Sequence, residues 1–130
     1  MTAVMTDCFG DTVILPDAQE AAKLFEEQAD LVMPTGTPGQ VIWVGTEVDR
    51  KILRVDIDTA QGRAALRWLP DGTHAVELEP GSPIETYATS DGELAQVSGK
   101  LACVSPATAA RAVAEFVATG CRPTCVSWEQ

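Results

Sequence analysis

The sequence predicts an α+β fold: an antiparallel β-sheet of about five to seven strands with two α-helices packed on one face. The first observation is a run of short segments between residues 40 and 104 in which apolar and polar residues alternate, with turn residues between the segments. The second is a pair of segments with helical spacing of apolar residues, one before this run and one after it. With 130 residues, the chain is predicted to form a single domain, residues 1–130.

The N-terminal part is predicted to contain a short strand, residues 3–7, and the first helix. Asp17 followed by Glu20 fits a capping box at the start of a helix. Pro34 is expected to stop the helix and to begin a loop. The apolar side chains that recur at helical spacing, and that are expected to form one apolar face of this helix, are Ala18, Ala21, Ala22, Phe25, Ala29 and Val32.

The middle of the chain is predicted to form consecutive antiparallel strands. Their expected ranges are 40–45, 51–58, 63–69 and 73–79. The segment 46–50 is short enough to join the first two strands as a hairpin. The sequence Pro70-Asp71-Gly72 is a strong turn signal after the third strand. One or two further short strands are expected around the turn Ser90-Asp91-Gly92.

The C-terminal part is predicted to contain the second helix and a last strand. Ser105 suits the N-cap and Pro106 suits the first helical position, so the helix is expected to begin there. Gly120 is the expected end of the helix. After a turn at Arg122-Pro123, residues 124–128 are expected to form the closing strand.

The strand KILRVDID, residues 51–58, alternates almost without interruption. Leu53, Val55 and Ile57 point to one face of an extended chain, and the charged residues between them point to the other. If the helices cover the apolar face, the charged residues stand on an open face toward solvent. The residues expected on this open face are Arg54, Asp56, Asp58, Glu77 and Glu79, with Arg67 as a cross-strand partner that offsets some of the acidic charge.

The chain is strongly acidic, with 19 acidic and 9 basic residues and a net charge of −10. This charge argues against direct binding to nucleic acid, because the phosphates would be repelled. It favours solubility or attraction to a basic partner. No segment has the length of an apolar membrane span, and the N-terminus lacks the features of a secretory signal. We therefore expect no membrane contact and a cytoplasmic location.

The sequence contains little catalytic or cofactor-binding chemistry. It has no glycine-rich nucleotide motif and no nucleophile elbow, so we expect no catalytic residue and no cofactor. The sequence has only one histidine, His74, and therefore offers few ligands for a zinc ion. We expect no bound metal. His74 is expected to be a partly buried strand residue. The four cysteines, which we expect to be buried apolar residues, are Cys8, Cys103, Cys121 and Cys125.

The best candidate for metal chemistry is the pair Asp56 and Asp58. Their carboxylates project from one face of a strand, about 7 Å apart, and such acids bind Mg²⁺ in enzymes that act on phosphate esters. Outward charged residues at alternate positions are, however, what any half-exposed sheet requires.

Three tryptophans, Trp43, Trp68 and Trp128, lie in predicted strands. Core packing is expected for at least one or two of them. An exposed tryptophan beside acidic residues would be a good anchor for a protein interface, because its ring is large, rigid and amphipathic.

Three segments of the chain resemble immunity protein family one of bacterial polymorphic toxin systems. They are VIWVGTEVDRKILRVD, RWLPDGTHAVEL and EFVATGCRPTCVSW. The family's hairpin pattern, Val-Gly-x-x-x-Asp-Arg, is matched by Val44-Gly45 and Asp49-Arg50. Its C-terminal pattern is a helix that ends near Gly120, followed by Arg122-Pro123 and the closing Trp128. The resemblance extends over residues 12–128.

This resemblance implies a small non-enzymatic α+β protein that is encoded beside a toxin gene and neutralises the toxin by binding it. The toxins of such systems are often nucleases or nucleic-acid deaminases, whose basic active-site cleft an acidic surface would occlude. The family supplies no contact residues, so the candidates come from the physical pattern alone. The candidate toxin-binding residues are Asp56, Asp58, Glu77, Glu79, Arg54, Trp43 and Trp68.

Two other functions remain open on the sequence. One is a protein-binding adaptor or chaperone of a secretion system, which would share all of these features and differ only in its partner. The other is a metal-dependent phosphoesterase that uses Asp56 and Asp58. The neighbouring gene distinguishes the first from an immunity protein, and titration with Mg²⁺ or Mn²⁺ tests the second.

Overall fold

The computed structural model describes residues 1–130, which form one mixed sheet and two α-helices. In chain order the elements are β1 (Ala3–Thr6), β2 (Thr12–Leu15), α1 (Ala18–Ala29), the short 3₁₀ helix η1 (Pro34–Gly36), β3 (Gly39–Thr46), β4 (Leu53–Asp58), β5 (Arg63–Trp68), β6 (Thr73–Val76), β7 (Ile84–Tyr87), β8 (Leu94–Val97), α2 (Pro106–Thr119) and β9 (Ser127–Glu129). The predicted α+β class is confirmed. The sheet has nine strands rather than five to seven, and β2 is a strand that no sequence pattern indicated.

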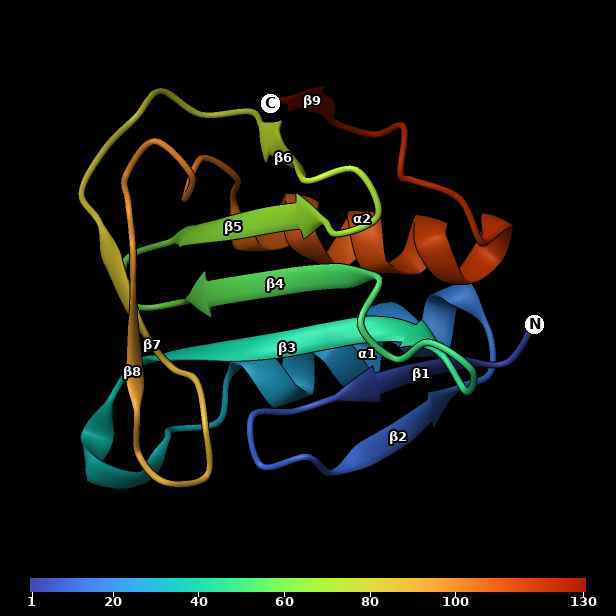
Figure 1. Ribbon diagram of the computed structural model, residues 1–130, viewed down its shortest axis with the longest axis horizontal. Coiled ribbons are helices and arrows are strands. Elements are labelled where there is room, and N and C mark those ends of the chain that lie inside the picture. Colours follow the sequence, from blue (N-terminus) through green and yellow to red (C-terminus); the bar gives the residue numbers. More distant parts are fainter.

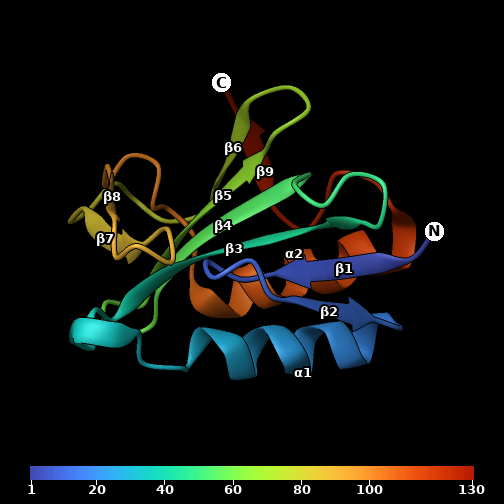
Figure 2. The same ribbon diagram turned by 60° about the horizontal axis from the view of Figure 1, so that its bottom comes forward.

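The main path of the sheet runs in the order β2-β1-β3-β4-β5-β6-β9, with every neighbouring pair antiparallel. β3, β4 and β5 form its centre, and the predicted hairpin between the first two is confirmed. β7 leaves this path: it pairs in parallel with the start of β3 and antiparallel with β8. Both helices lie behind the sheet in Figure 1, whereas the β7–β8 hairpin crosses in front of it. Figure 2 shows α1 below the strands and the β7–β8 hairpin at the left end of the sheet.

The helices cover one face of the sheet and enclose the main core. Leu53, Val55 and Ile57 project from β4 into this core, so the alternation predicted for that strand is confirmed. Phe25 of α1 and Phe116 of α2 are the largest side chains that are fully buried there. Both helices therefore have the amphipathic character that their sequences predict.

The predicted helix starts are confirmed. Asp17 accepts a hydrogen bond from the main-chain N–H of Glu20 at 2.8 Å, and Ser105 caps α2 through the N–H of Thr108 at 3.2 Å. Gly120 ends α2 in the left-handed conformation, with φ of 72°. The expectation that Val32 belongs to the apolar face of this helix was wrong, because α1 ends at Ala29 and Val32, beyond its end, is 77% exposed.

A second, smaller core lies on the opposite face of the sheet. Ile84 and Val97 of the β7–β8 hairpin pack there against Ala65 of β5 and Ala102. The hairpin therefore covers one end of the sheet face that the helices do not cover. This cover decides which polar side chains of β3, β4 and β5 reach solvent.

The cysteines divide into two pairs. Cys8 and Cys103 are buried, as expected. Cys121 and Cys125 are exposed, so the expectation of burial was wrong for these two, which lie in the loop between α2 and β9. Neither helix of the protein combines the length and the hydropathy that crossing a membrane requires.

Candidate functional site

Asp56 and Asp58 lie on the face away from the helices, but their exposed fractions are only 0% and 2%. Asp56 accepts hydrogen bonds from Nε and Nη2 of Arg54 at 2.8 and 3.2 Å, and from Oγ1 of Thr86 in β7 at 3.0 Å. Asp58 accepts the main-chain N–H of Gln61 at 3.0 Å in the turn before β5. The expectation that both carboxylates face solvent was wrong, because the β7–β8 hairpin lies over this end of the sheet.

The geometry does not favour a phosphoesterase built on these two aspartates. Both carboxylates are bound by donors of the protein itself, and neither is open to a substrate. No group of three or more histidine, cysteine, aspartate or glutamate side chains stands where it can hold a metal ion. Both aspartates are engaged in contacts within the fold.

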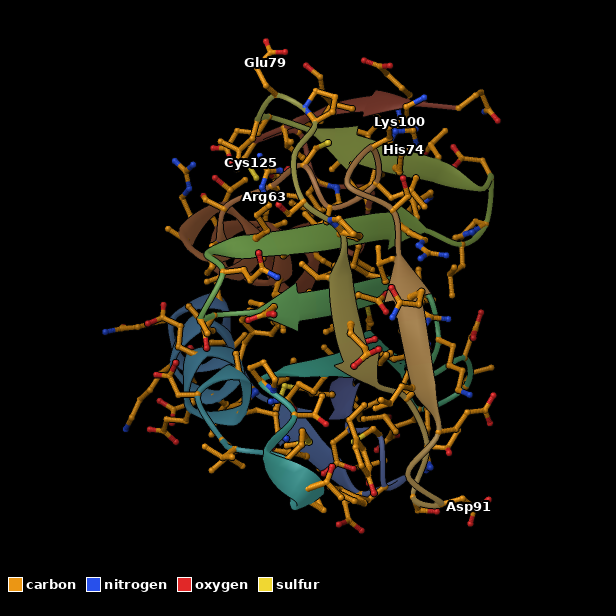
Figure 3. The ribbon with its side chains drawn as sticks, turned by 90° about the vertical axis from the view of Figure 1, so that its left-hand side faces the viewer. Arg63, His74, Glu79, Asp91, Lys100 and Cys125 are labelled. Atoms are coloured by element: carbon orange, nitrogen blue, oxygen red, sulfur yellow. The ribbon has the colours of Figure 1, made fainter.

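Glu77 and Glu79 do not join the aspartates, because β6 ends at Val76. The main-chain N–H of Glu77 donates to the carbonyl of Cys103, and the chain turns toward the helices. Oε1 of Glu77 accepts the N–H of Ser105 at 2.8 Å, so this carboxylate sits at the N-terminus of α2, where negative charge is favourable. Glu79 is exposed and points away from the sheet in Figure 3. The expectation that these acids share one face with the aspartates was therefore wrong.

The surroundings of Glu77 lower the pKa of its carboxyl group. Burial is the largest single influence and raises the pKa, but the hydrogen bonds from Thr108 and Ser105, together with the charge of Arg111, outweigh it. A carboxyl whose pKa is lower in the folded than in the unfolded state stabilises the fold above the unfolded pKa. That contribution disappears as pH falls through the folded pKa.

We therefore expect Glu77→Gln to lower the free energy of unfolding at pH 7 by about 0.5–1 kcal/mol, the usual cost of a lost contact at an exposed helix N-terminus. The difference from the wild type should shrink as pH falls below 4.5, the ordinary pKa of this group. Urea unfolding across this pH range measures it. Glu79→Gln is the matched control, because it removes the same charge from a side chain that makes no hydrogen bond. A difference that stays constant with pH would contradict the expectation.

A row of charged and aromatic side chains crosses the uncovered part of the same face. In the register of the sheet, Trp43 lies opposite Arg54, Arg54 opposite Arg67, and Arg67 opposite His74. Directly paired residues project to the same face, so these four side chains from β3, β4, β5 and β6 form one line. We call them the open-face row. All four are partly exposed, and the row therefore presents cations and a tryptophan to solvent instead of the predicted acids.

The two tryptophans expected to act as anchors lie on opposite faces of the sheet. Trp43 belongs to the open-face row, with Nζ of Lys51 at 4.4 Å from its ring centroid and Cζ of Arg54 at 5.8 Å. Trp68 is paired with Leu53, and its ring packs edge-on against Phe116 with centroids 5.8 Å apart. Only Trp43 remains a candidate anchor on the open face, because Trp68 packs against the main core.

The surface beside Trp43 is hollowed into an open depression of about 310 Å³. Its walls come from the β1–β2 turn, from Trp43 and Lys51, and from the β7–β8 loop at residues 88–90. Thr6 and Thr89 are among the residues of this lining. Sequence patterns did not indicate this depression, because the three segments that enclose it are far apart in the chain.

The comparison with known families agrees with the resemblance seen in the sequence. The family model described as immunity protein Imm1 matches residues 10–130. No curated protein matches the chain. The match covers every element from β2 to β9, including both helices, the central strands and the β7–β8 hairpin. This chain belongs to the Imm1 family of immunity proteins.

Proposed function

We propose that this protein binds a bacterial toxin in the cytoplasm and neutralises it by occupying the toxin's active site, without catalysing a reaction itself. The family match over residues 10–130 is the observation that carries this proposal. The burial of Asp56 and Asp58 supports it, because the one carboxylate pair that suggested an enzyme is closed to solvent.

We infer further that the toxin acts on nucleic acid, as a deaminase or a nuclease, and has a basic cleft. The net charge of −10 supports this inference. Only two ion pairs are present, Arg54–Asp56 and Arg122–Asp71, so most of the acidic side chains are not neutralised by a neighbouring cation. Unneutralised charge attracts a basic partner over about 8–10 Å at physiological salt and raises the rate of association.

The acidic surface that would meet the toxin consists of exposed side chains and not of the buried Asp56 and Asp58. Glu85, Asp91 and Glu93 of the β7–β8 hairpin are exposed, and Glu79 precedes that hairpin. Asp91 marks the tip of the hairpin in Figure 3, with Glu79 at the far end of the same view. We propose that these acids face the basic rim of the toxin's cleft.

Co-expression with the product of the gene immediately upstream tests this function. We expect the immunity protein to restore the growth of cells that express this product, and to co-purify with its catalytically inactive form. The association rate should fall as the salt concentration rises, because the encounter is electrostatic. Absence of both a complex and growth rescue would contradict the proposal. A complex without rescue would instead indicate the adaptor or chaperone function.

A further inference from the structure

We propose that the depression around Trp43 is the anchor point of the toxin interface and receives a carboxylate side chain of the toxin. We call it the anchor site and define it by Thr6, Trp43, Lys51 and Thr89. Arg67 of the open-face row lies on the same face, two strands away from Trp43. This inference rests on the proposed function and adds the chemistry of the contact.

Unpartnered polar groups gather on this side of the sheet. Three buried side-chain atoms in the protein have no hydrogen-bond partner: Oγ1 of Thr6, Oγ1 of Thr89 and Nε of Arg67. Thr6 is only 7% exposed and is paired with Trp43, so its side chain lies on the open face. Thr6 and Thr89 are both among the residues that line the depression. Because a buried polar group without a partner costs about 1–3 kcal/mol, their concentration at one place indicates a surface that a ligand completes.

Two cations on this face of the sheet are not neutralised within the protein. Lys51 and Arg67 form no ion pair, whereas the charge of Arg54 is already held by Asp56. In the sheet, Arg67 lies between Arg54 and His74 and faces no acid. A carboxylate fits this set because it accepts hydrogen bonds from hydroxyl and ammonium groups and carries the opposite charge.

One acid, Asp7, also lines the depression, and one of its two carboxylate oxygens is already bound. Oδ1 of Asp7 accepts the main-chain N–H groups of Phe9 and Asp11 at 2.9 and 3.0 Å, which closes the β1–β2 turn. The ammonium group of Lys51 lies instead over the face of the Trp43 ring. The cation and the ring attract each other, which helps to hold Trp43 in place. Tryptophan is also one of the residue types that contribute most to the binding energy of protein interfaces.

The charge pattern around the anchor site favours a protein carboxylate over a nucleic-acid phosphate. The whole protein carries a charge of −10, and exposed acids at the hairpin tip, Asp91 and Glu93, follow directly after the residues that line the depression. A polyanion would be repelled by this rim. Enzymes that act on nucleic acid place carboxylates inside a basic cleft, as a general acid and base or as metal ligands. Cations inside an acidic rim are complementary to that arrangement.

Charge reversal at Lys51, compared with the same change at Lys23, tests the anchor site. Both lysines are exposed, and each Lys→Glu variant changes the net charge by −2, from −10 to −12. Lys23 lies on α1, on the other side of the sheet. We expect Lys51→Glu to raise the Kd for the catalytically inactive upstream product by about tenfold or more, because a charge-assisted hydrogen bond becomes a repulsion. Lys23→Glu should leave the Kd unchanged or lower it slightly.

The possible outcomes separate the anchor site from the proposed function. Equal Kd values for the two variants, with tight binding by the wild type, would overturn the anchor site alone. No binding and no growth rescue by the wild type would overturn the proposed function, and the anchor site with it. Retention of a labelled single-stranded oligonucleotide by the wild type but not by Lys51→Glu would reassign the site to nucleic acid. Recovery of tight binding when one toxin carboxylate is changed to lysine would support the anchor site and identify the residue. Circular dichroism confirms that both variants are folded.

Discussion

Asp56→Asn is expected to lower the free energy of unfolding by about 2–4 kcal/mol, because it removes one partner from a buried ion pair. Asp56 is fully buried and accepts two hydrogen bonds from Arg54 and one from Thr86. Asparagine has one acceptor oxygen in place of two and no charge, so the guanidinium loses its counter-ion. The side chain of Arg54 is 25% exposed, and water therefore recovers a part of the loss.

Urea unfolding at neutral pH measures this effect, and Asp91→Asn provides the control. Asp91 is an exposed acid at the tip of the same β7–β8 hairpin, so its replacement should change the free energy of unfolding by less than about 0.5 kcal/mol. A loss below about 1 kcal/mol for Asp56→Asn would mean that the ion pair and the hairpin contact contribute little. The rate at which the folded variant associates with the toxin should be close to that of the wild type, because the carboxylate lies below the surface.

Phe116→Ala is expected to lower the free energy of unfolding by about 3–5 kcal/mol, the usual cost of truncating a fully buried phenylalanine. Phe116 is 0% exposed on α2, and its ring meets the edge of Trp68 at a centroid distance of 5.8 Å. The substitution leaves a cavity between the helix and the centre of the sheet. Domains of this kind have a total stability of about 5–15 kcal/mol, so the loss is a large share of it.

Thermal and urea unfolding measure the effect of Phe116→Ala, with the tryptophan fluorescence as the signal. Phe9→Ala is the control, because Phe9 is 39% exposed and lies outside the main core. We expect this control to lose no more than about 1 kcal/mol. A loss below about 1.5 kcal/mol for Phe116→Ala would show that the core rearranges to fill the cavity.

The sequence predicted those structural features that depend on residues a few positions apart in the chain. Asp17, Ser105 and Gly120 set helix ends through contacts within a few residues, and the structure confirms each of them. Leu53 to Ile57 alternate because successive side chains of a strand point to opposite faces, and the same segment forms the expected hairpin with β3. Val32 shows the limit of this approach, because apolar spacing continues past the point where the chain leaves the helix.

The candidate site was predicted only in part, because it depends on contacts between distant segments. Trp43 and Arg54 were among the expected residues, and both lie on the open face. Asp56 was placed on the correct face of its strand, but Thr86, 30 residues further along the chain, covers it. Lys51, Thr6 and Thr89 were missed as site residues, since no local pattern brings the β1–β2 turn, the β3–β4 hairpin and the β7–β8 loop together.

By itself, the sequence determined the α+β class, the two capped helices, the central hairpin, the acidic charge and the resemblance to an immunity protein family. Each of these follows from composition, from local hydrogen bonding or from the period of apolar residues, which act over short stretches of chain. Tertiary structure alone decided which polar residues reach solvent. The register of four strands aligned Trp43, Arg54, Arg67 and His74, and the packing of the β7–β8 hairpin buried the aspartates. The row forms between consecutive strands, but its register depends on which residues pair across them, and the burial of Asp56 depends on Thr86, 30 residues further along the chain. Together these contacts replaced an expected acidic face with a cationic and aromatic one.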